Sequence, residues 1–329
     1  MDTVLLTGCA GFIGFHTAKE LLRLGHRVVG YDNVNDYYDT GIKESRLAVL
    51  NENPDFVFYR ADICDEKALE DVMKKHPEIN RVIHLAAQAG VRYSLICPEK
   101  YIETNIVGTF RILELCRRHG IDRLMFASSS SVYGDAEQEL LHTELRTDKP
   151  ISLYAATKKS DEVLAYAYCN NYGINAVGMR FFTVYGPYGR PDMAYFGFTE
   201  KILRDEPIEV YNFGEQYRDF TYIDDLLTGI MGIYRYQSAL EPGIGDYRIF
   251  NIGNGNPVKL MDFIETIEQV VGKAAKKILV GRQTGDVTGT YADVSSLKEI
   301  CDYSPKTSLK DGISEFYRWY QDYRYSDSR

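Results

Sequence analysis

A tyrosine and a lysine stand four residues apart in the string YAATK, as Tyr154 and Lys158. On a helix this spacing puts both side chains on one face. A free phenol is a poor base at neutral pH, but an ammonium fixed beside it favours the phenolate. The preceding string FASSSSVYG, residues 126–134, offers serine hydroxyls that can hold a substrate oxygen while its proton leaves. Ordinary helix surfaces also carry tyrosine and lysine at this spacing, so the catalytic interpretation depends on the rest of the chain.

A glycine-rich turn near the N-terminus provides that context. The string TGCAGFIG, residues 7–14, follows an apolar run and contains three glycines, which could serve a tight turn alone. However, a helical pattern starts at Phe12, and a second strand ends in Asp32, 18 residues after Gly14. A carboxylate there can bind an adenosine ribose, and the helix N-terminus offers N–H groups to a pyrophosphate. These features predict a dinucleotide site, and the acidic residue favours NAD over NADP.

The first half of the chain alternates between short apolar runs and helical patterns. This alternation predicts right-handed crossovers and a parallel sheet covered on both faces, which is a doubly wound α/β fold. After about residue 180 the rhythm loosens, which indicates a smaller second lobe, with the chain returning to the sheet around 220–252. The predicted strands are 3–7, 27–31, 56–59, 81–85, 122–127 and 175–180, and the predicted helices lie near 12–24, 65–75, 99–118 and 154–171.

The composition excludes several classes of function. With 38 lysines and arginines against 47 aspartates and glutamates, the formal net charge is −9, which argues against binding to nucleic acid. No apolar run approaches the roughly 20 residues of a membrane helix, and we see no signal peptide. The six cysteines form no CxxC pair and the six histidines do not cluster. We therefore expect reduced thiols, no metal site and a cytoplasmic location.

The motifs GxxGxxG, SSSxVYG and YxxxK together resemble those of the extended short-chain dehydrogenase/reductases, and the resemblance covers essentially the whole chain. Several longer strings are similar to those of UDP-glucuronate 4-epimerases. These strings are DNVNDYYD (32–39), HLAAQAGVRYS (84–94), SLYAATKK (152–159), RFFTVYGPYGRPDMAYF (180–196) and RDFTYIDD (218–225).

The resemblance implies a Rossmann-type NAD-binding domain and a smaller, mixed C-terminal lobe that binds a UDP-sugar. The corresponding domains are 1–180 plus about 220–252 for NAD, and 181–219 plus 253–329 for the UDP-sugar. Tyr154 would be the base, Lys158 would tune it and bind the nicotinamide ribose, and Ser129 would be the hydroxyl partner. With Tyr154 and Lys158, the residues expected to contact the cofactor are Gly8, Gly11, Phe12, Ile13, Gly14, Asp32, Asn33, Asp62, Ile63, Leu85, Ala86, Ala87, Gln88 and Asn105.

The same resemblance implies where the sugar nucleotide would bind. Arg190 and Arg218 would face the diphosphate, since paired guanidinium groups suit a dianion. In GRQTGD, residues 281–286, related enzymes often have arginine where Gln283 stands, so either it or the adjacent Arg282 could touch phosphate. Our hypothesis for a sugar carboxylate is that Thr183 and Ser130 bind it; alternatively, Thr183 only packs a strand end. The expected substrate residues are Arg92, Ser130, Ser131, Thr183, Arg190, Arg218 and Arg282.

The residues after Ser129 indicate which of the family's reactions this chain can catalyse. Family dehydratases carry an Asp-Glu pair there, and decarboxylases commonly have glutamate at the position of Ser131, whereas this chain has Ser130 and Ser131. The resemblance therefore implies C4 epimerisation of UDP-glucuronate to UDP-galacturonate through a transient 4-keto sugar. The alternatives are a UDP-glucose/UDP-galactose 4-epimerase, a UDP-glucuronate decarboxylase and a non-catalytic NAD-binding regulator. A homodimer joined through the helices near 99–118 and 154–171 is also implied.

Overall fold

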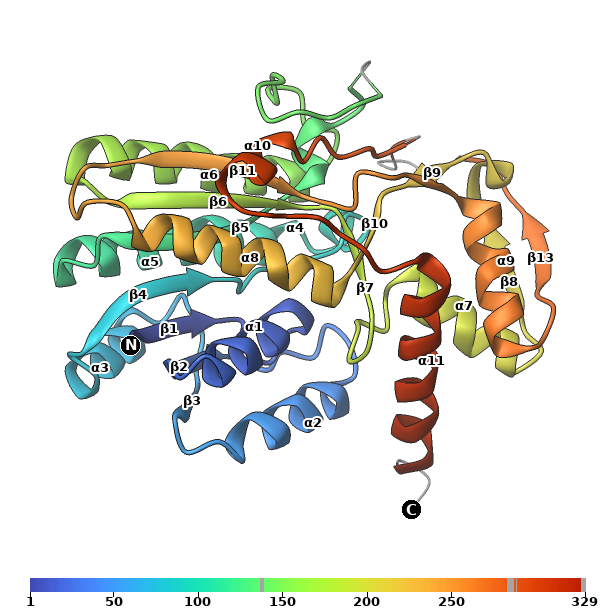
Figure 1. Ribbon diagram of the computed structural model, residues 1–329, viewed down its shortest axis with the longest axis horizontal. Coiled ribbons are helices and arrows are strands. Elements are labelled where there is room, and N and C mark those ends of the chain that lie inside the picture. The colour runs from blue at the N-terminus through green and yellow to red at the C-terminus, as the bar shows by residue number, and fades with distance from the viewer. Residues whose placement is uncertain (137–138, 283–286, 288, 327–329) are drawn as a thin grey trace.

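The computed structural model describes residues 1–136, 139–282, 287 and 289–326. Its centre is a seven-stranded sheet in the order β11-β6-β5-β4-β1-β2-β3, in which all neighbours are parallel (Figure 1). This doubly wound order confirms the predicted fold class, and the six predicted strands all occur, with ends shifted by at most two residues. The strands are β1 (Thr3–Thr7), β2 (Arg27–Asp32), β3 (Phe56–Arg60), β4 (Ile79–His84), β5 (Arg123–Ser129), β6 (Asn175–Phe181) and β11 (Tyr247–Ile252).

The strands send alternate side chains to the two faces of the sheet, as pleated strands do. On β1, Val4 and Leu6 belong to one buried cluster, whereas Leu5 belongs to the other. On β5, Met125 joins the first cluster and Phe126 the second. The first cluster packs against α1 (Phe12–Arg23), α2 (Thr40–Asn51) and α8 (Ile223–Ser238), and the second packs against α3 (Glu66–Lys75), α5 (Gly108–His119) and α6 (Leu153–Tyr172).

Helix α2 is not among the helices predicted from the sequence. Its buried face combines Ile42 and Leu47 with two charged residues, Lys43 and Arg46. Charged residues are normally exposed, so a pattern based on apolar positions misses this face. Arg46 donates to the Ala10 carbonyl of the glycine turn and Lys43 donates to Asn35, and these contacts account for the buried charges.

The predicted helix near 99–118 consists of three consecutive segments. Short helix α4 (Pro98–Tyr101) leads into a π-helical segment, η2 (Ile102–Val107), which continues into α5. A π-helical turn admits one extra residue per turn and shifts the side chains that follow. Here it places Asn105 in the interior, where the side chain is fully buried.

The remaining elements extend the molecule on the side where β7 (Thr183–Tyr185) and β10 (Phe220–Tyr222) form a parallel pair. We call α7 (Ala194–Leu203), β8 (Pro207–Val210), α9 (Leu260–Val271) and β13 (Lys276–Leu279) the outer lobe, which lies on the right in Figure 1. Helix α11 (Leu309–Ser326) packs on α9. The other short elements are η1 (Tyr93–Leu95), η3 (Ser130–Tyr133), η4 (Tyr211–Gly214), β9 (Tyr217–Arg218), β12 (Val258–Lys259) and α10 (Ser295–Ile300).

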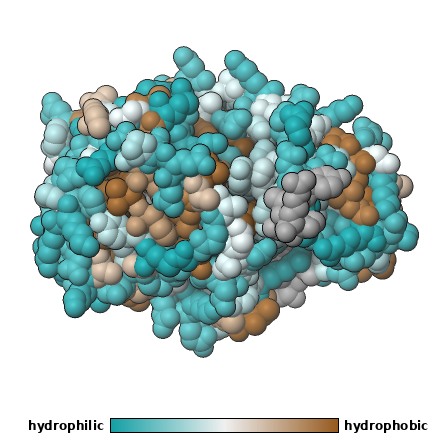
Figure 2. Space-filling model, turned by 90° about the horizontal axis from the view of Figure 1, so that it is seen from below, coloured by the Kyte–Doolittle hydropathy of each residue, from teal (hydrophilic) through white to brown (hydrophobic). Residues whose placement is uncertain are grey.

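Figure 2 shows one face of the molecule, on which hydrophilic residues cover much of the surface. In the view of Figure 2, hydrophobic residues gather in separate patches between polar ones, in line with a composition in which 26% of residues are charged. Among the described residues, no helix is both long and apolar enough to cross a membrane.

A buried ion pair ties α6 to the sheet. Arg180 of β6 donates from Nε and Nη2 to the two carboxylate oxygens of Glu162, at 2.8 and 2.9 Å. The Ser128 hydroxyl of β5 donates to the same carboxylate at 2.7 Å. Burial disfavours the charged carboxylate, but the hydrogen bonds and charge of Arg180 prevail and lower the pKa of Glu162. The pair therefore stabilises the fold above the acid range, and that contribution is lost as the pH falls through this lowered pKa.

Glu162→Gln is expected to lower the free energy of unfolding by about 3 kcal/mol, because it leaves a buried guanidinium without a counter-charge. Urea unfolding at neutral pH measures the change. The control is Glu315→Gln, whose partner Arg318 is exposed (side chains 48% and 67% exposed), and which should cost less than about 1 kcal/mol. Equal losses in the two variants would contradict the importance of the buried pair.

Candidate active site

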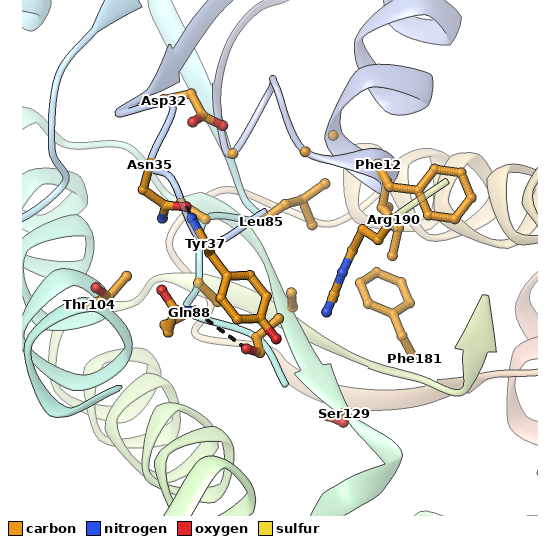
Figure 3. A pocket seen from close by; sticks show the side chains of 18 of the residues that line it. Phe12, Asp32, Asn35, Tyr37, Leu85, Gln88, Thr104, Ser129, Phe181 and Arg190 are labelled. Carbon is orange, nitrogen blue, oxygen red and sulfur yellow. Dashed lines mark hydrogen bonds between the residues drawn. The ribbon is translucent and has the colours of Figure 1, made fainter. Parts of the chain in front are cut away.

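A single cavity runs along the carboxyl ends of the central strands. The glycine turn lines one part, and the start of α6 lines another (Figure 3). Ligands of open α/β sheets bind at this edge. The predicted residues that line the cavity are Gly8, Gly11, Phe12, Ile13, Gly14, Asp32, Asn33, Ile63, Leu85, Ala86, Ala87, Gln88, Ser129, Tyr154, Lys158 and Arg190.

The three glycines of the turn have different roles. A Cβ on Gly8 would lie 2.6 Å from the backbone N of Ala86, and one on Gly14 would lie 2.0 Å from the Gly8 carbonyl, so both permit close packing of the chain. Gly11 lines the cavity, and a Cβ there would meet only the Gly8 oxygen, at 3.0 Å, which leaves an open cradle for a ligand. Gly11 also caps α1 without any side-chain hydrogen bond, so the helix N-terminus is open to a phosphate. The turn thus fits a dinucleotide, because it offers both open space at Gly11 and the uncapped N-terminus of α1.

Asp32 lies at the end of β2, where the adenosine ribose is predicted. Its carboxylate accepts hydrogen bonds from the backbone N–H groups of Ala10 (3.1 Å) and Val34 (2.8 Å), which fix it beside the turn. Burial raises its pKa, although these hydrogen bonds and the nearby charges of Lys43 and Arg46 oppose the shift. Each carboxylate oxygen has a second lone pair, so both can still accept from ribose hydroxyls.

Asn105, a predicted cofactor contact, is fully buried behind residues that line the cavity. Asn105 accepts from the Gln88 N–H (2.7 Å) and donates to the Gln88 carbonyl (3.1 Å) and to Thr157 Oγ1 (2.9 Å). Its amide is thereby occupied, so the structure places Asn105 as a positioning residue for the wall that Gln88 forms. Asp62, another predicted contact, is partly exposed beside Asn33, which lines the cavity. Asp62 accepts from Asn33 Nδ2 and the Cys64 N–H, both at 2.8 Å, and each of its oxygens keeps a lone pair for a ligand.

The catalytic candidates meet at the other end of the cavity. Ser152 caps α6 by accepting from the Ala155 N–H (3.1 Å), which puts Tyr154 in the first turn. Lys158 is 2% exposed, and its ammonium donates to the Ala127 carbonyl (2.9 Å) and to Asp161 Oδ2 (3.1 Å). Burial raises the pKa of Asp161 to about 6, and the charge and hydrogen bond of Lys158 oppose this shift.

Three predicted substrate residues with hydroxyl groups, of which Ser130 and Thr183 are the ones predicted for a sugar carboxylate, lie next to cavity-lining residues in the sequence. Ser130 and Ser131 begin η3 directly after Ser129, whose hydroxyl accepts from the Ser131 N–H at 3.1 Å. Thr183 begins β7 and comes immediately after Phe181 and Phe182, which line the cavity. All three of these hydroxyl residues are partly exposed.

The four predicted substrate arginines are placed differently. Arg190 lines the cavity and pairs with Asp192. Arg218 is partly buried and donates to Gln216 Oε1 (3.2 Å) and the carbonyls of Tyr217 (3.0 Å) and Val287 (2.8 Å). Arg92 is exposed, with its guanidinium 4.8 Å from the centre of the Tyr211 ring, and Arg282 pairs with Asp135 at 3.1 Å. None of these last three lines the described cavity, and Gln283 lies outside the described residues.

Several lining residues are absent from the sequence prediction. Three of them, Asn35, Tyr37 and Tyr38, belong to the string DNVNDYYD that supports the resemblance, so for these the signal was present without a role for each position. The lining residues absent from the prediction include Asn35, Tyr37, Tyr38, Lys43, Thr104, Phe181, Phe182 and Met193. In the part of the chain that the structure describes, no group of three or more His, Cys, Asp or Glu residues is placed to hold a metal ion.

Comparison with known proteins agrees with this geometry. The "NAD dependent epimerase/dehydratase family" matches residues 4–253. A probable UDP-glucuronate 4-epimerase of Rhizobium meliloti is 42% identical, covering 97% of each chain. The crystal structure of a UDP-glucuronic acid 4-epimerase from Bacillus cereus with UDP-glucuronic acid and NAD aligns with a TM-score of 0.90, at 35% identity over 98% of this chain and 99% of that one.

A Thermotoga maritima UDP-glucose 4-epimerase structure also aligns, at 28% identity and a TM-score of 0.86, covering 98% of this chain and 99% of that one. The fold, the glycine turn and the Ser-Tyr-Lys set thus occur in a chain that matches the family model over most of its length. The protein belongs to the NAD dependent epimerase/dehydratase family.

Proposed function

We propose that the protein is an NAD-dependent UDP-glucuronate 4-epimerase, which interconverts UDP-glucuronate and UDP-galacturonate. The observation that carries this proposal is the meeting of Ser129, Tyr154 and Lys158 in one dinucleotide cavity. It is reinforced by full-length similarity to a protein crystallised with UDP-glucuronic acid and NAD. We further propose that 1–180 plus about 220–252 bind NAD, and that 181–219 plus 253–329 bind the UDP-sugar.

The chain's own residues supply the acid–base chemistry. Gly11, Asp32 and the N-terminus of α1 would hold the cofactor, and bound NAD⁺ supplies a hydride acceptor that returns the hydride within the same turnover. Tyr154 removes the proton of the sugar C4 hydroxyl, while Ser129 holds that oxygen. Lys158 supplies a positive charge that is buried and fixed between Ala127 and Asp161, one helical turn from Tyr154 on the same face of α6. One of its three N–H donors remains for a ribose hydroxyl.

The fate of the 4-keto sugar depends on what stands beside it. Ser130 and Ser131 cannot run an elimination or a decarboxylation as acidic groups could, so rotation about the diphosphate linkage and reduction on the opposite face remain. Arg190 would hold the diphosphate during this rotation. A 4-keto glucuronate loses CO₂ readily when its carboxylate bond stands perpendicular to the carbonyl plane. We propose that Thr183 and Ser130 hold the carboxylate away from that alignment.

Tyr154→Phe is expected to lower kcat by about 10²- to 10⁴-fold, because it removes the base while keeping the ring. Product NMR with UDP-glucuronate measures turnover and identity: UDP-galacturonate supports the proposal, whereas CO₂ release indicates a decarboxylase. Conversion of UDP-glucose alone indicates the neutral-sugar epimerase, and no conversion of either sugar indicates a non-catalytic NAD-binding protein. Tyr172→Phe, on the same helix, is the control and should keep full activity. Full activity of Tyr154→Phe would overturn the assignment.

Thr183→Val keeps the shape of the side chain and removes its hydroxyl. We expect a roughly tenfold loss of affinity for UDP-glucuronate, since a hydrogen bond to a charged group is lost, together with detectable CO₂ release. Steady-state kinetics and a CO₂ assay measure both effects, with Thr266→Val on α9 as the control. If turnover, affinity and CO₂ release all match the wild type, Thr183 does not bind the carboxylate.

We also propose a homodimer, formed through η2, α5 and α6. These helices pack against each other and expose apolar side chains: Val107 and Phe110 are each 38% exposed, Val163 is 57% exposed and Tyr166 is 58% exposed. Adjacent exposed apolar groups on two neighbouring helices are typical of a surface that a partner covers. A cytoplasmic location is proposed as well, supported by six free cysteines, all within the described residues; cell fractionation would check it.

Val163→Asp is expected to convert a dimer into a monomer, because it places a charge at the centre of the proposed contact. Sedimentation velocity of both proteins at equal concentration measures the mass. Ile278→Asp on β13, where the side chain is 48% exposed, is the control and should remain dimeric. A monomeric wild type, or a dimeric Val163→Asp variant, would exclude this interface.

A further inference from the structure

Tyr37 lines the cavity but has no part in the proposed reaction. It belongs to the segment between β2 and α2, and its hydroxyl donates to Asp192 Oδ2 at 3.1 Å, across 155 residues of sequence. In the view of Figure 3 its ring lies between Gln88 and Arg190, over the middle of the cavity. The hydroxyl needs the space beside Gly90, where a Cβ would come within 2.3 Å of it. One side chain thus crosses from the Asp32 side of the cavity to the loop that carries Arg190.

The segment that carries Tyr37 is fixed on its own side. Asn35 Oδ1 accepts from the Tyr37 N–H (3.3 Å), and Lys43 Nζ donates both to that oxygen (2.9 Å) and to the Asn35 carbonyl (2.7 Å). Asp39 then caps α2 by accepting from the Gly41 N–H at 2.9 Å. The segment is therefore held at both ends. At its tip, the Tyr37 ring packs on Tyr93 with 5.0 Å between ring centres, and the Tyr37 hydroxyl makes the hydrogen bond to Asp192.

The far side of the contact is fixed as well. Arg190 donates from Nε to Asp192 Oδ1 at 2.9 Å and from Nη2 to Oδ2, which orients the carboxylate toward Tyr37. The preceding loop is held by the buried guanidinium of Arg46, which donates to the carbonyls of Tyr188 (2.6 Å) and Gly189 (3.2 Å). Arg46 also donates to the Ala10 carbonyl of the glycine turn at 2.8 Å, so the same guanidinium holds the loop before Arg190 against that turn.

The hydroxyl remains a donor at every physiological pH. Burial, and next the charge of Asp192, raise the pKa of Tyr37 to about 12. Asp192 stays ionised, because Arg190 and the Tyr37 hydrogen bond lower its pKa against the effect of burial. The contact is therefore a hydrogen bond from a neutral phenol to a carboxylate, which is stronger than one between neutral groups.

We propose that Tyr37 and Asp192 fasten the segment 33–39 over the bound dinucleotide, so that NAD leaves only when this hydrogen bond opens. The cavity extends from Asp32 to Tyr154, and Tyr37 is among the residues that line it, so an extended ligand that fills the cavity would lie against the Tyr37 ring. Retention suits a redox-neutral reaction, since the oxidised cofactor is regenerated in every turnover and need not exchange. The proposal concerns the cofactor and does not depend on which sugar the protein converts.

The test is the rate at which the NAD-loaded protein releases its cofactor in the absence of any UDP-sugar. Released NAD⁺ is captured by excess alcohol dehydrogenase and ethanol, and its reduction is followed at ~340 nm, the absorption band of the reduced cofactor. Tyr37→Phe keeps the ring and removes the hydroxyl, and should release NAD roughly five- to tenfold faster than the wild type. Tyr37→Ala removes the cover as well and should be faster still.

The matched control is Tyr236→Phe, which removes an equivalent hydrogen bond, from Tyr236 to Asp246 Oδ2 at 3.0 Å, on the partly buried surface of α8. It should release NAD at the wild-type rate. Thermal unfolding of the NAD-free proteins reports whether either change merely destabilises the fold. Wild-type release from Tyr37→Phe, or equal acceleration in Tyr236→Phe, would overturn the proposal. Since no sugar is present, a wrong assignment of the substrate leaves this result unaffected.

Discussion

The buried ammonium of Lys158 is the group on which the arrangement of the active site depends. A charge with 2% exposure is costly unless it is paired, and here the Ala127 carbonyl and Asp161 satisfy it. The first partner lies near the end of β5 and the second lies one turn along α6. The ammonium therefore fixes the strand end that carries Ser129 against the first turn of the helix that carries Tyr154. The contacts that compensate the buried charge of Lys158 are therefore the same contacts that position Ser129 and Tyr154 for the proposed reaction.

Elsewhere in the cavity, buried polar groups behind the lining set the positions of those in front. Asn105 holds the backbone of Gln88 from both sides, and Arg46 joins the glycine turn to the loop before Arg190. Both side chains are fully buried, and each satisfies backbone groups that have no regular secondary-structure partner. The two binding loops are thus held by one guanidinium, which couples the position of the cofactor cradle to that of the arginine proposed to bind the diphosphate.

Much of this arrangement could be predicted from local patterns. Continuous apolar runs located the six strands, and the turn at 7–14 with Asp32 located the dinucleotide end, because both signals depend on neighbours in sequence. The spacing of Tyr154 and Lys158 was sufficient to place them together on α6. The contributions of Asn35, Tyr37 and Lys43 could not be predicted in the same way. Their positions depend on partners far along the chain, such as Asp192, and on a helix whose buried face includes charges.

The positions of Asn105 and Asp62 show a related limit. Both follow strand ends, as ligand-binding residues of such sheets do. The position of a residue after a strand end predicts that it lies near the ligand, but it does not predict which way its side chain points. A π-helical segment turns Asn105 inward, and Asp62 accepts from Asn33 and from the Cys64 N–H beside the cavity. Arg92 likewise comes soon after the carboxyl end of β4 in the sequence, but its guanidinium stacks on the Tyr211 ring at the surface.

The hydrophobic cluster on the α1, α2 and α8 face has a consequence for how the chain can be divided. It includes Val4 and Leu6 of β1 and runs without interruption to Phe263 of α9 and Phe316 of α11. The C-terminal third therefore completes an interior that begins with the first strand. A fragment ending near residue 253, where the family match stops, would expose this apolar surface to water and should associate with itself. The N-terminal and C-terminal parts of the chain share one interior, so we expect them to melt in a single transition.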